Sequence, residues 1–165
     1  MEVDGDFDEF VRSRADALLR LAYLLVGDRG RAEDVVQDVL ERMYPRWGRI
    51  SDSPEAYARR AVVNATVNHW RWRRRHRETA LSAAVEPHIE DHAVLVSGRQ
   101  AIVTALGDLS RQQRAAVVLR YLNGLSIDEV ADLLGCTAGA VKSHTARGLA
   151  KLRVALSDAS ERNPR

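Results

Sequence analysis

Residues 125–153 read LSIDEVADLLGCTAGAVKSHTARGLAKLR and carry the signals of two short helices joined by a tight turn. Ser126 followed by Glu129 predicts a capping box at the start of the first helix. Gly135 predicts its end, because glycine readily adopts a positive φ, and Thr137 predicts the cap of the second helix. The inward apolar stripes are Ile127, Val130, Ala131 and Leu134, then Val141, Thr145, Gly148 and Leu152. This layout predicts a helix-turn-helix, whose second helix enters the major groove of DNA.

The outward face of that second helix is suited to close contact with DNA. Ala146 and Ala150 are small, so the backbone can approach closely, while Lys142, Ser143 and Arg147 supply contacts to phosphates and base edges. A surface helix with ordinary solvating charges is the alternative. The cap, the turn and both apolar stripes agree, and that agreement favours the helix-turn-helix.

The first part of the chain also has helical periodicity. Apolar residues recur at a 4-3-4-3 spacing in the first helix, and VGDRG ends it. A second helix begins near Asp28, which can cap it. The predicted buried positions are Val11, Ala15, Leu18, Ala22 and Leu25, then Ala32, Val35, Val36, Val39, Leu40 and Met43. The opposite face of the second helix is an acidic row formed by Asp34, Gln37, Asp38 and Glu41.

A third helix is predicted from about Pro54 into the stretch HWRWRRRHR, residues 69–77. At about 100° per residue, six polar side chains fall within about 80° of one another and form what we call the polar ridge. Apolar residues flank the ridge on both sides, with Trp70 and Trp72 expected to pack. Arginine suits phosphate, asparagine suits base edges and tyrosine suits base stacking, whereas a solvated polar face is the alternative. The ridge consists of Tyr57, Arg60, Asn64, Asn68, Arg71 and Arg75.

The two helical parts are separated by residues 79–93, which lose periodicity and contain a proline and scattered acids. Helical pattern resumes at about Val94 and runs to Leu106, and a further helix begins at GDLSR. Strand-like alternation is absent. The predicted fold is therefore all-α: an N-terminal helical domain (1–78), a flexible linker (79–93) and a C-terminal helix-turn-helix domain (94–165).

Composition limits the function classes. The net charge is only +2, but residues 69–78 hold five arginines against one acid, so basic charge is localised as expected for phosphate binding. Cys136 is the only cysteine, which excludes an intrachain disulfide and a Cys-rich metal site. We expect no cofactor or metal and no enzymatic activity, since no phosphate-binding glycine loop, ligand cluster or activated nucleophile is present. With no leader or membrane span recognised, the cytoplasm is the expected location.

Three segments in order resemble the small extracytoplasmic-function (ECF) sigma factors of bacterial RNA polymerase, of the short actinobacterial type. The segments are AEDVVQDVLERMY, then AYARRAVVNATVNHWRWRRR, then LSRQQRAAVVLRYLNGLSIDEVADLLGCTAGAVKSHTARGLAKLR. The likeness covers about residues 7–153. It implies a protein that binds core RNA polymerase and directs promoter-specific initiation, reading the −10 and −35 elements and helping to open the duplex.

The resemblance also implies roles for particular residues. The acidic row matches the segment that docks on the clamp helices of the largest catalytic subunit, and the flap of the second-largest subunit is a further expected contact. The polar ridge matches the helix for −10 recognition and melting, with Asn64 expected to touch a base. The loop at about 48–53 is placed to hold a flipped base. An anti-sigma factor is a common partner in the family. The residues expected at the −35 element are Arg120, Lys142, Ser143, His144, Arg147 and Lys151.

Two departures from the family pattern limit what can be carried over. His144 stands where many relatives have arginine, and Ala146 stands where some have a large apolar residue. The −35 sequence therefore cannot be inferred.

Other functions remain open from the residues alone. GLSIDEVADLLGCTAGAVKSH also resembles the helix-turn-helix of response regulators, which makes a stand-alone transcriptional regulator the main alternative, although residues 1–106 show no receiver or ligand-sensing domain. A nucleic-acid-processing enzyme and a helical adaptor are the remaining candidates. The acidic row could instead hold a metal, but no histidine stands at ligand spacing.

Overall fold

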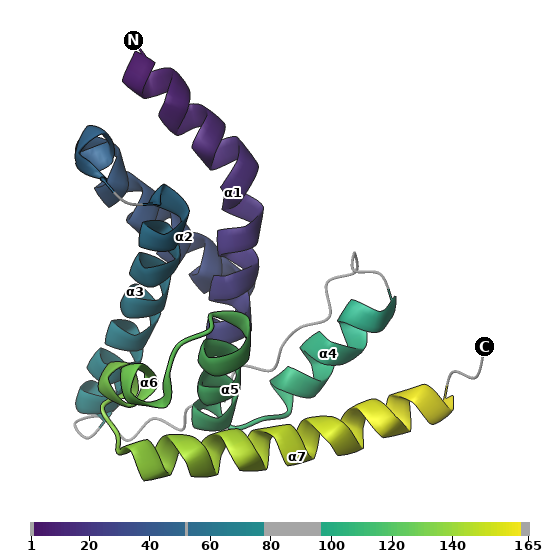
Figure 1. Cartoon of the computed structure of the whole chain (residues 1–165). Helices are drawn as coiled ribbons and strands as arrows, with labels where there is room; N and C mark the ends of the chain where they lie inside the picture. The colour runs from purple at the N-terminus through teal and green to yellow at the C-terminus, as the bar shows by residue number, and fades with distance from the viewer. Residues whose placement is uncertain (1, 52, 78–96, 163–165) are drawn as a thin grey trace. The chain divides into compact units, whose positions relative to one another are not determined.

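The computed structural model describes residues 2–51, 53–77 and 97–162, and all regular structure in these ranges is helical (Figure 1). The predicted all-α class is confirmed. The chain divides into two compact units, Met1–Glu86 and Pro87–Arg165. The predicted linker 79–93 lies outside the described residues, so the predicted domain limits stay predictions.

The first unit is a bundle of three helices in which each helix packs against the other two. They are α1 (Glu2–Val26), α2 (Arg29–Met43) and α3 (Pro54–Arg77), with a short 3-10 helix, η1 (Tyr44–Arg49), after α2. The predicted stripes form the core, except that Val11, Ala15, Val35 and Leu40 are only half-buried. Side chains at most 2% exposed are Leu18, Ala22, Leu25, Ala32, Val39, Met43, Ala58, Val62, Val63 and Thr66.

The turn between α1 and α2 follows from two local signals. Gly27 has a φ of 75°, a conformation that costs glycine little, so it can end α1. Asp28 then caps α2, its Oδ1 accepting a hydrogen bond from the backbone N of Arg31 at 2.8 Å. The predicted cap at Asp28 is confirmed, and the turn brings the apolar stripes of α1 and α2 face to face.

The second unit is built around the long helix α7 (Ala138–Arg162), which packs against α4 (Ser97–Gly107), α5 (Arg111–Val117) and α6 (Ile127–Leu134). Ser110 and Gln113 form a capping box at the start of α5. After α5 the chain widens into a π-helical turn, η2 (Val118–Leu122), in which the backbone N of Asn123 bonds to the carbonyl of Val118 at 3.2 Å. The helical pattern predicted from Val94 is present from Ser97, and 94–96 lie outside the described residues.

Candidate nucleic-acid and protein interfaces

The polar ridge lies on the side of α3 opposite the bundle core. Ala58, Val62, Val63, Thr66 and Val67 are each at most 3% exposed, and they span about half the helix circumference with Thr66 near the centre. The Thr66 hydroxyl donates to the Val62 carbonyl at 2.9 Å, so its burial leaves no unmet polar group. The centre of the ridge is about 160° from Thr66. The two apolar flanks are therefore the edges of one buried face, joined through a threonine that was not counted as core.

Most of the ridge is open to contact. Tyr57, Arg60, Asn68, Arg71 and Arg75 are exposed, Tyr57 at 39%, and Asn64 is half-buried. The Nε of Arg75 donates to the backbone carbonyl of Arg71 at 3.4 Å. The helix thus gathers all six predicted residues on one face. That this face reads the −10 element, with Asn64 against a base, stays a prediction.

Trp72 does not pack into the bundle, and the expectation that it would is wrong. Its side chain is 55% exposed and stacks with His76, with ring centroids 4.2 Å apart, and with His69 at 6.4 Å. The His76 Nδ1 bonds to the Trp72 carbonyl at 2.8 Å, which orients the imidazole. The last turns of α3 give the indole partners on its own helix, and Trp70 is half-buried.

The helix-turn-helix has the predicted caps. Ser126 Oγ accepts from the backbone N of Glu129 at 3.2 Å, and Glu129 Oε2 accepts from the backbone N of Ser126 at 2.7 Å. Gly135 has a φ of 65°, and Thr137 Oγ1 accepts from the backbone N of Ala140 at 3.1 Å. All three local predictions are confirmed. Because both helices start and stop through side chains within the motif, the turn between α6 and α7 is fixed locally.

The start of α7 presents the residues predicted for the −35 element over a wide arc. Lys142, Arg147 and Lys151 are exposed, whereas Ser143 and His144 are half-buried. At about 100° per residue these five side chains span about 200° of the helix surface, with Lys142 at one edge and His144 at the other. A helix lying in a groove has walls on two sides, and such an arc suits that geometry. The predicted DNA contacts themselves remain untested.

The inward face of α7 approaches α5 most closely at Gly148. A Cβ added there would lie 2.8 Å from Cγ2 of Val117 and 3.4 Å from the carbonyl oxygen of Gln113. Val141 is fully buried about two turns earlier, and Thr145 bonds to its carbonyl at 2.8 Å. The absence of a side chain at Gly148 therefore sets how closely the recognition helix sits on its scaffold.

Arg120 has a structural bond within its own unit. Its side chain is half-buried, and Nη1 donates to the carbonyl of Leu125. This bond ties η2 to the residue before Ser126, which begins the capping box of α6. Arg120 thus has a structural role, and its contact with the −35 element stays a prediction.

The acidic row on α2 divides between two surfaces. Gln37 and Glu41, joined by a hydrogen bond of 2.9 Å, line a groove of about 590 Å³ between α1 and α2. Asp34 is exposed outside the groove, and Asp38 pairs with Arg42. The groove has an apolar floor and an acidic rim, which reading one helix at a time could not reveal. Its lining residues from α1 include Phe7, Asp8, Val11, Ala15, Asp16 and Leu19.

One acidic group beside this groove has a strong partner. Glu33 also lines it, and its Oε1 accepts a hydrogen bond from Arg29 Nε at 2.8 Å. That hydrogen bond, together with the charge of the carboxylate, raises the pKa of Arg29. The two residues form an exposed ion pair within the first turns of α2.

Within the described ranges no three His, Cys, Asp or Glu side chains are grouped as metal ligands. In the same ranges no helix combines the length and apolar character that crossing a bilayer requires.

The chain is similar to known proteins over nearly its whole length. The family models for Sigma-70 region 2 and Sigma-70, region 4 match residues 10–76 and 99–152. The RNA polymerase sigma-E factor of Streptomyces avermitilis is 40% identical, over 90% of this chain and 83% of that protein. The ECF RNA polymerase sigma factor SigM of Mycobacterium tuberculosis is 35% identical, over 91% and 78%. The sigma factor RpoE of Bartonella quintana, solved in complex with the anti-sigma factor NepR, superposes with a TM-score of 0.67 at 26% identity, over 92% of this chain and 97% of that one.

Proposed function

The chain belongs to the extracytoplasmic-function sigma factors of bacterial RNA polymerase, and from this membership we propose how its exposed surfaces divide the work of initiation. It is a promoter-specific initiation factor, whose partners are core RNA polymerase and promoter DNA. The proposal rests on where the exposed polar residues lie. The ridge on α3 faces away from the core of one unit, and the outward face of α7 lies in the other.

The acidic row docks on the polymerase. Asp34, Gln37 and Glu41 are exposed on α2, and an apolar groove with an acidic rim runs beside two of them. Such a surface suits a helical partner that brings apolar side chains and basic side chains together. We assign this contact to the clamp helices of the largest catalytic subunit, and a second contact, made by Pro87–Arg165, to the flap of the second-largest subunit.

The polar ridge binds the −10 element as a single strand whose bases are unstacked. Opening the duplex and turning a base out costs a few kcal/mol, so the exposed bases must gain new partners. Tyr57 supplies a ring for stacking, Asn64 and Asn68 supply amides for base edges, and Arg60, Arg71 and Arg75 supply charge for phosphates. Capture of these bases stabilises the open state without chemistry on the strand.

The start of α7 reads the −35 element in the major groove. Lys142, Ser143, His144, Arg147 and Lys151 lie on the arc described above, and Arg147 is the side chain suited to a bidentate contact with guanine. We assign Arg120, which lies on η2, to the same −35 contact. Each unit alone makes few specific contacts with DNA. When both units are docked on the polymerase, binding of one DNA element by the first unit raises the effective concentration of the second unit at the other element.

Three further assignments complete the proposal. The chain catalyses no reaction itself, since its contribution is binding and positioning. It works in the cytoplasm, where its polymerase is. An anti-sigma factor holds it inactive, a regulation supported by the complex in which the structurally similar RpoE of Bartonella quintana was solved.

In vitro transcription with core polymerase on fragmented genomic DNA tests the proposal. We expect the chain to create start sites that core polymerase alone does not use, and aligned upstream sequences to show two conserved blocks. The Asn64→Ala variant should lose discrimination at one −10 position while its affinity for core polymerase is unchanged. A stand-alone regulator would bind DNA without core polymerase and create no start sites, which would reject the assignment.

A further inference from the structure

One face of α1 contacts both ends of the segment that joins α2 to α3. Phe7, Phe10 and Arg14 are spaced three and four residues apart, so they lie within about 60° of one another on the helix. The two phenylalanines contact η1, and Arg14 contacts the first turn of α3. Residues 48–53, which the resemblance implies hold a flipped base, run from the end of η1 to the residue before α3, and Asp52 among them lies outside the described residues.

The first anchor is aromatic. The Trp47 ring of η1 lies 5.1 Å from the ring of Phe7 and 5.0 Å from that of Phe10, at interplanar angles of 78° and 49°. Tyr44 meets Phe7 at 5.2 Å. Phe7 is only 8% exposed, so these contacts cover most of its ring. Edge-to-face pairs at such distances are stabilising beyond the area that they bury, so η1 is held against α1 up to the turn where Ile50 N bonds to the Trp47 carbonyl.

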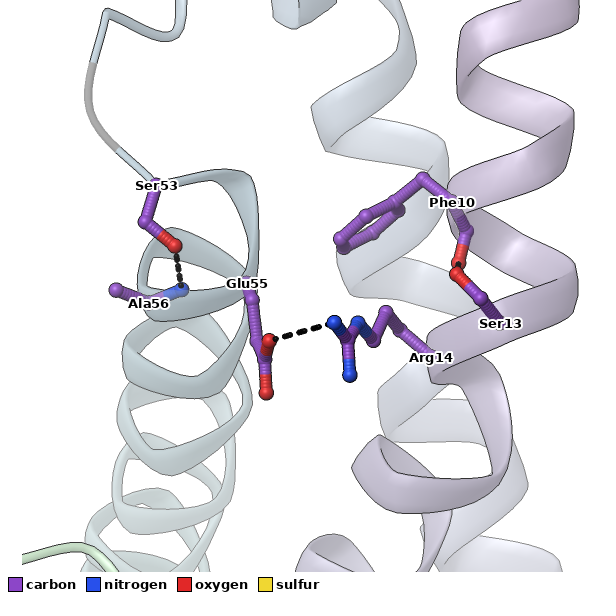
Figure 2. A network of polar contacts seen from close by, with 6 residues as sticks. All are labelled: Phe10, Ser13, Arg14, Ser53, Glu55 and Ala56. Carbon is purple, nitrogen blue, oxygen red and sulfur yellow. Dashed lines mark hydrogen bonds and ion pairs between the residues drawn. The ribbon is translucent and has the colours of Figure 1, made fainter.

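The second anchor is polar. Figure 2 shows Arg14 reaching from α1 to Glu55 on the first turn of α3, with Nη2 and Oε2 3.3 Å apart. Ser53 caps that turn, its Oγ accepting from the backbone N of Ala56 at 3.3 Å and its carbonyl accepting from the backbone N of Tyr57 at 3.0 Å. Ser13 bonds to the Phe10 carbonyl within α1. Both ends of the loop are thus fixed to a third element.

We infer that Phe10 and Arg14 of α1 are positioning residues for base capture: they hold Trp47 and Glu55, and thereby both ends of loop 48–53, at the spacing that a captured −10 base requires. The inference rests on the proposed function, because it needs a promoter base to be captured. Groups whose positions are already fixed before binding lose less conformational entropy on binding a base, so the benefit appears in the captured state. Neither residue needs to touch DNA.

The ion pair offers the sharper variants, because both of its side chains are partly exposed, at 48% and 38%, and its loss leaves the core intact. Arg14→Ala removes the pair, and Arg14→Glu combined with Glu55→Arg restores it in reverse. Arg12→Ala is the matched control: Arg12 is on the same helix and pairs with Asp8 at 4.0 Å, but that pair lies within α1 and touches neither end of the loop. Phe10→Leu tests the aromatic anchor while keeping an apolar side chain.

The experiment couples each variant to a missing base. Holoenzyme binding is measured on a promoter taken from the transcription assay above, with abasic sites placed one at a time across the non-template −10 strand. In the wild type we expect one position at which the abasic site weakens binding by roughly five- to 150-fold, the range of one base stack. In Arg14→Ala and Phe10→Leu that penalty should shrink at least threefold, while Arg12→Ala keeps it and the charge swap restores it.

A purely structural role would weaken binding to all templates alike and leave the abasic penalty unchanged, and that result overturns the inference. Affinity for core polymerase and urea stability are measured on the same variants, so that a folding defect is recognised as such. If wild-type holoenzyme forms no promoter complex, the proposed function itself fails. If it forms one without any sensitive base, base capture and its positioning fail together while the sigma role stands.

Discussion

The close approach of α7 to α5 predicts that Gly148→Ala destabilises the second unit. The added Cβ would lie 2.8 Å from Cγ2 of Val117, closer than real carbon contacts, so either the Val117 side chain or α7 itself has to shift. Overpacking of this kind costs about 1–3 kcal/mol, while alanine in place of glycine inside a helix gains about 1 kcal/mol. The net loss is therefore about 1 kcal/mol. For a unit of this size that corresponds to a decrease of about 1 M in the urea midpoint.

The assay can follow the two units separately. All three tryptophans, Trp47, Trp70 and Trp72, are in Met1–Glu86, so indole fluorescence follows that unit, whereas circular dichroism follows the helices of both. Urea unfolding of the full-length chain should show an earlier circular-dichroism transition for Gly148→Ala and an unchanged fluorescence transition. A shift of both would mean that the effect is not confined to the α5–α7 contact.

Gly139→Ala is the matched control on the same helix. A Cβ there would meet only Thr137 Oγ1, at 3.9 Å, so alanine should stabilise by up to about 1 kcal/mol through helix propensity alone. Adding Val117→Ala to Gly148→Ala removes the clashing methyl, so the double variant should lose less than the sum of the two single variants. The steric reasoning is refuted if Gly148→Ala raises the midpoint as Gly139→Ala does.

The remaining predictions concern the interfaces and one cap. Arg147→Ala should lose about 1–3 kcal/mol of promoter binding and relax specificity at one −35 position; equal weakening of all promoters would make Arg147 a phosphate contact instead. Reversing the charges of Asp34 and Asp38 should weaken core polymerase binding, with only a small fall in the urea midpoint from loss of the Asp38–Arg42 pair, and unchanged affinity in a pull-down titration would remove the acidic row from the interface. Ser126→Ala should cost about 1 kcal/mol of stability of the second unit in the same urea assay, while Ser126→Asn should lose little; equal midpoints for wild type and Ser126→Ala would mean that the cap contributes nothing.

Local signals in the sequence were sufficient to predict where helices begin and end. Asp28, Ser126 and Thr137 cap helices through bonds to residues three positions away, and Gly135 ends one through its own φ. Such features depend on neighbouring residues only, so a single chain without relatives reveals them. The polar ridge was predicted for the same reason, since it is a property of one helix.

Features that depend on contacts between distant residues could not be predicted in this way. The aromatic anchor joins Phe7 and Phe10 to Trp47, residues far apart in the sequence, and periodicity describes one helix at a time. The groove between α1 and α2 is missed for the same reason. Thr66 is absent from the predicted core, yet it is buried, and its hydroxyl donates a hydrogen bond to the Val62 carbonyl within the helix. Trp72 was expected to pack, but two histidines on its own helix stack with it instead.

Because of the π-helical turn η2, the number of residues between α5 and α6 affects how the helix-turn-helix is oriented. Its hydrogen bond spans five residues, one more than in an α-helix, so one residue more is accommodated before the helix-turn-helix begins. A one-residue deletion between Val118 and Leu122 would convert the turn to a regular α-helical one and keep the following residues in phase with α5, whereas the same deletion with the π-helical turn retained would rotate the start of the helix-turn-helix by about 100°. The Arg120 bond to Leu125 could then no longer form as it does here. Insertions and deletions in this stretch therefore change the orientation of the recognition helix α7, even where each individual side chain tolerates substitution.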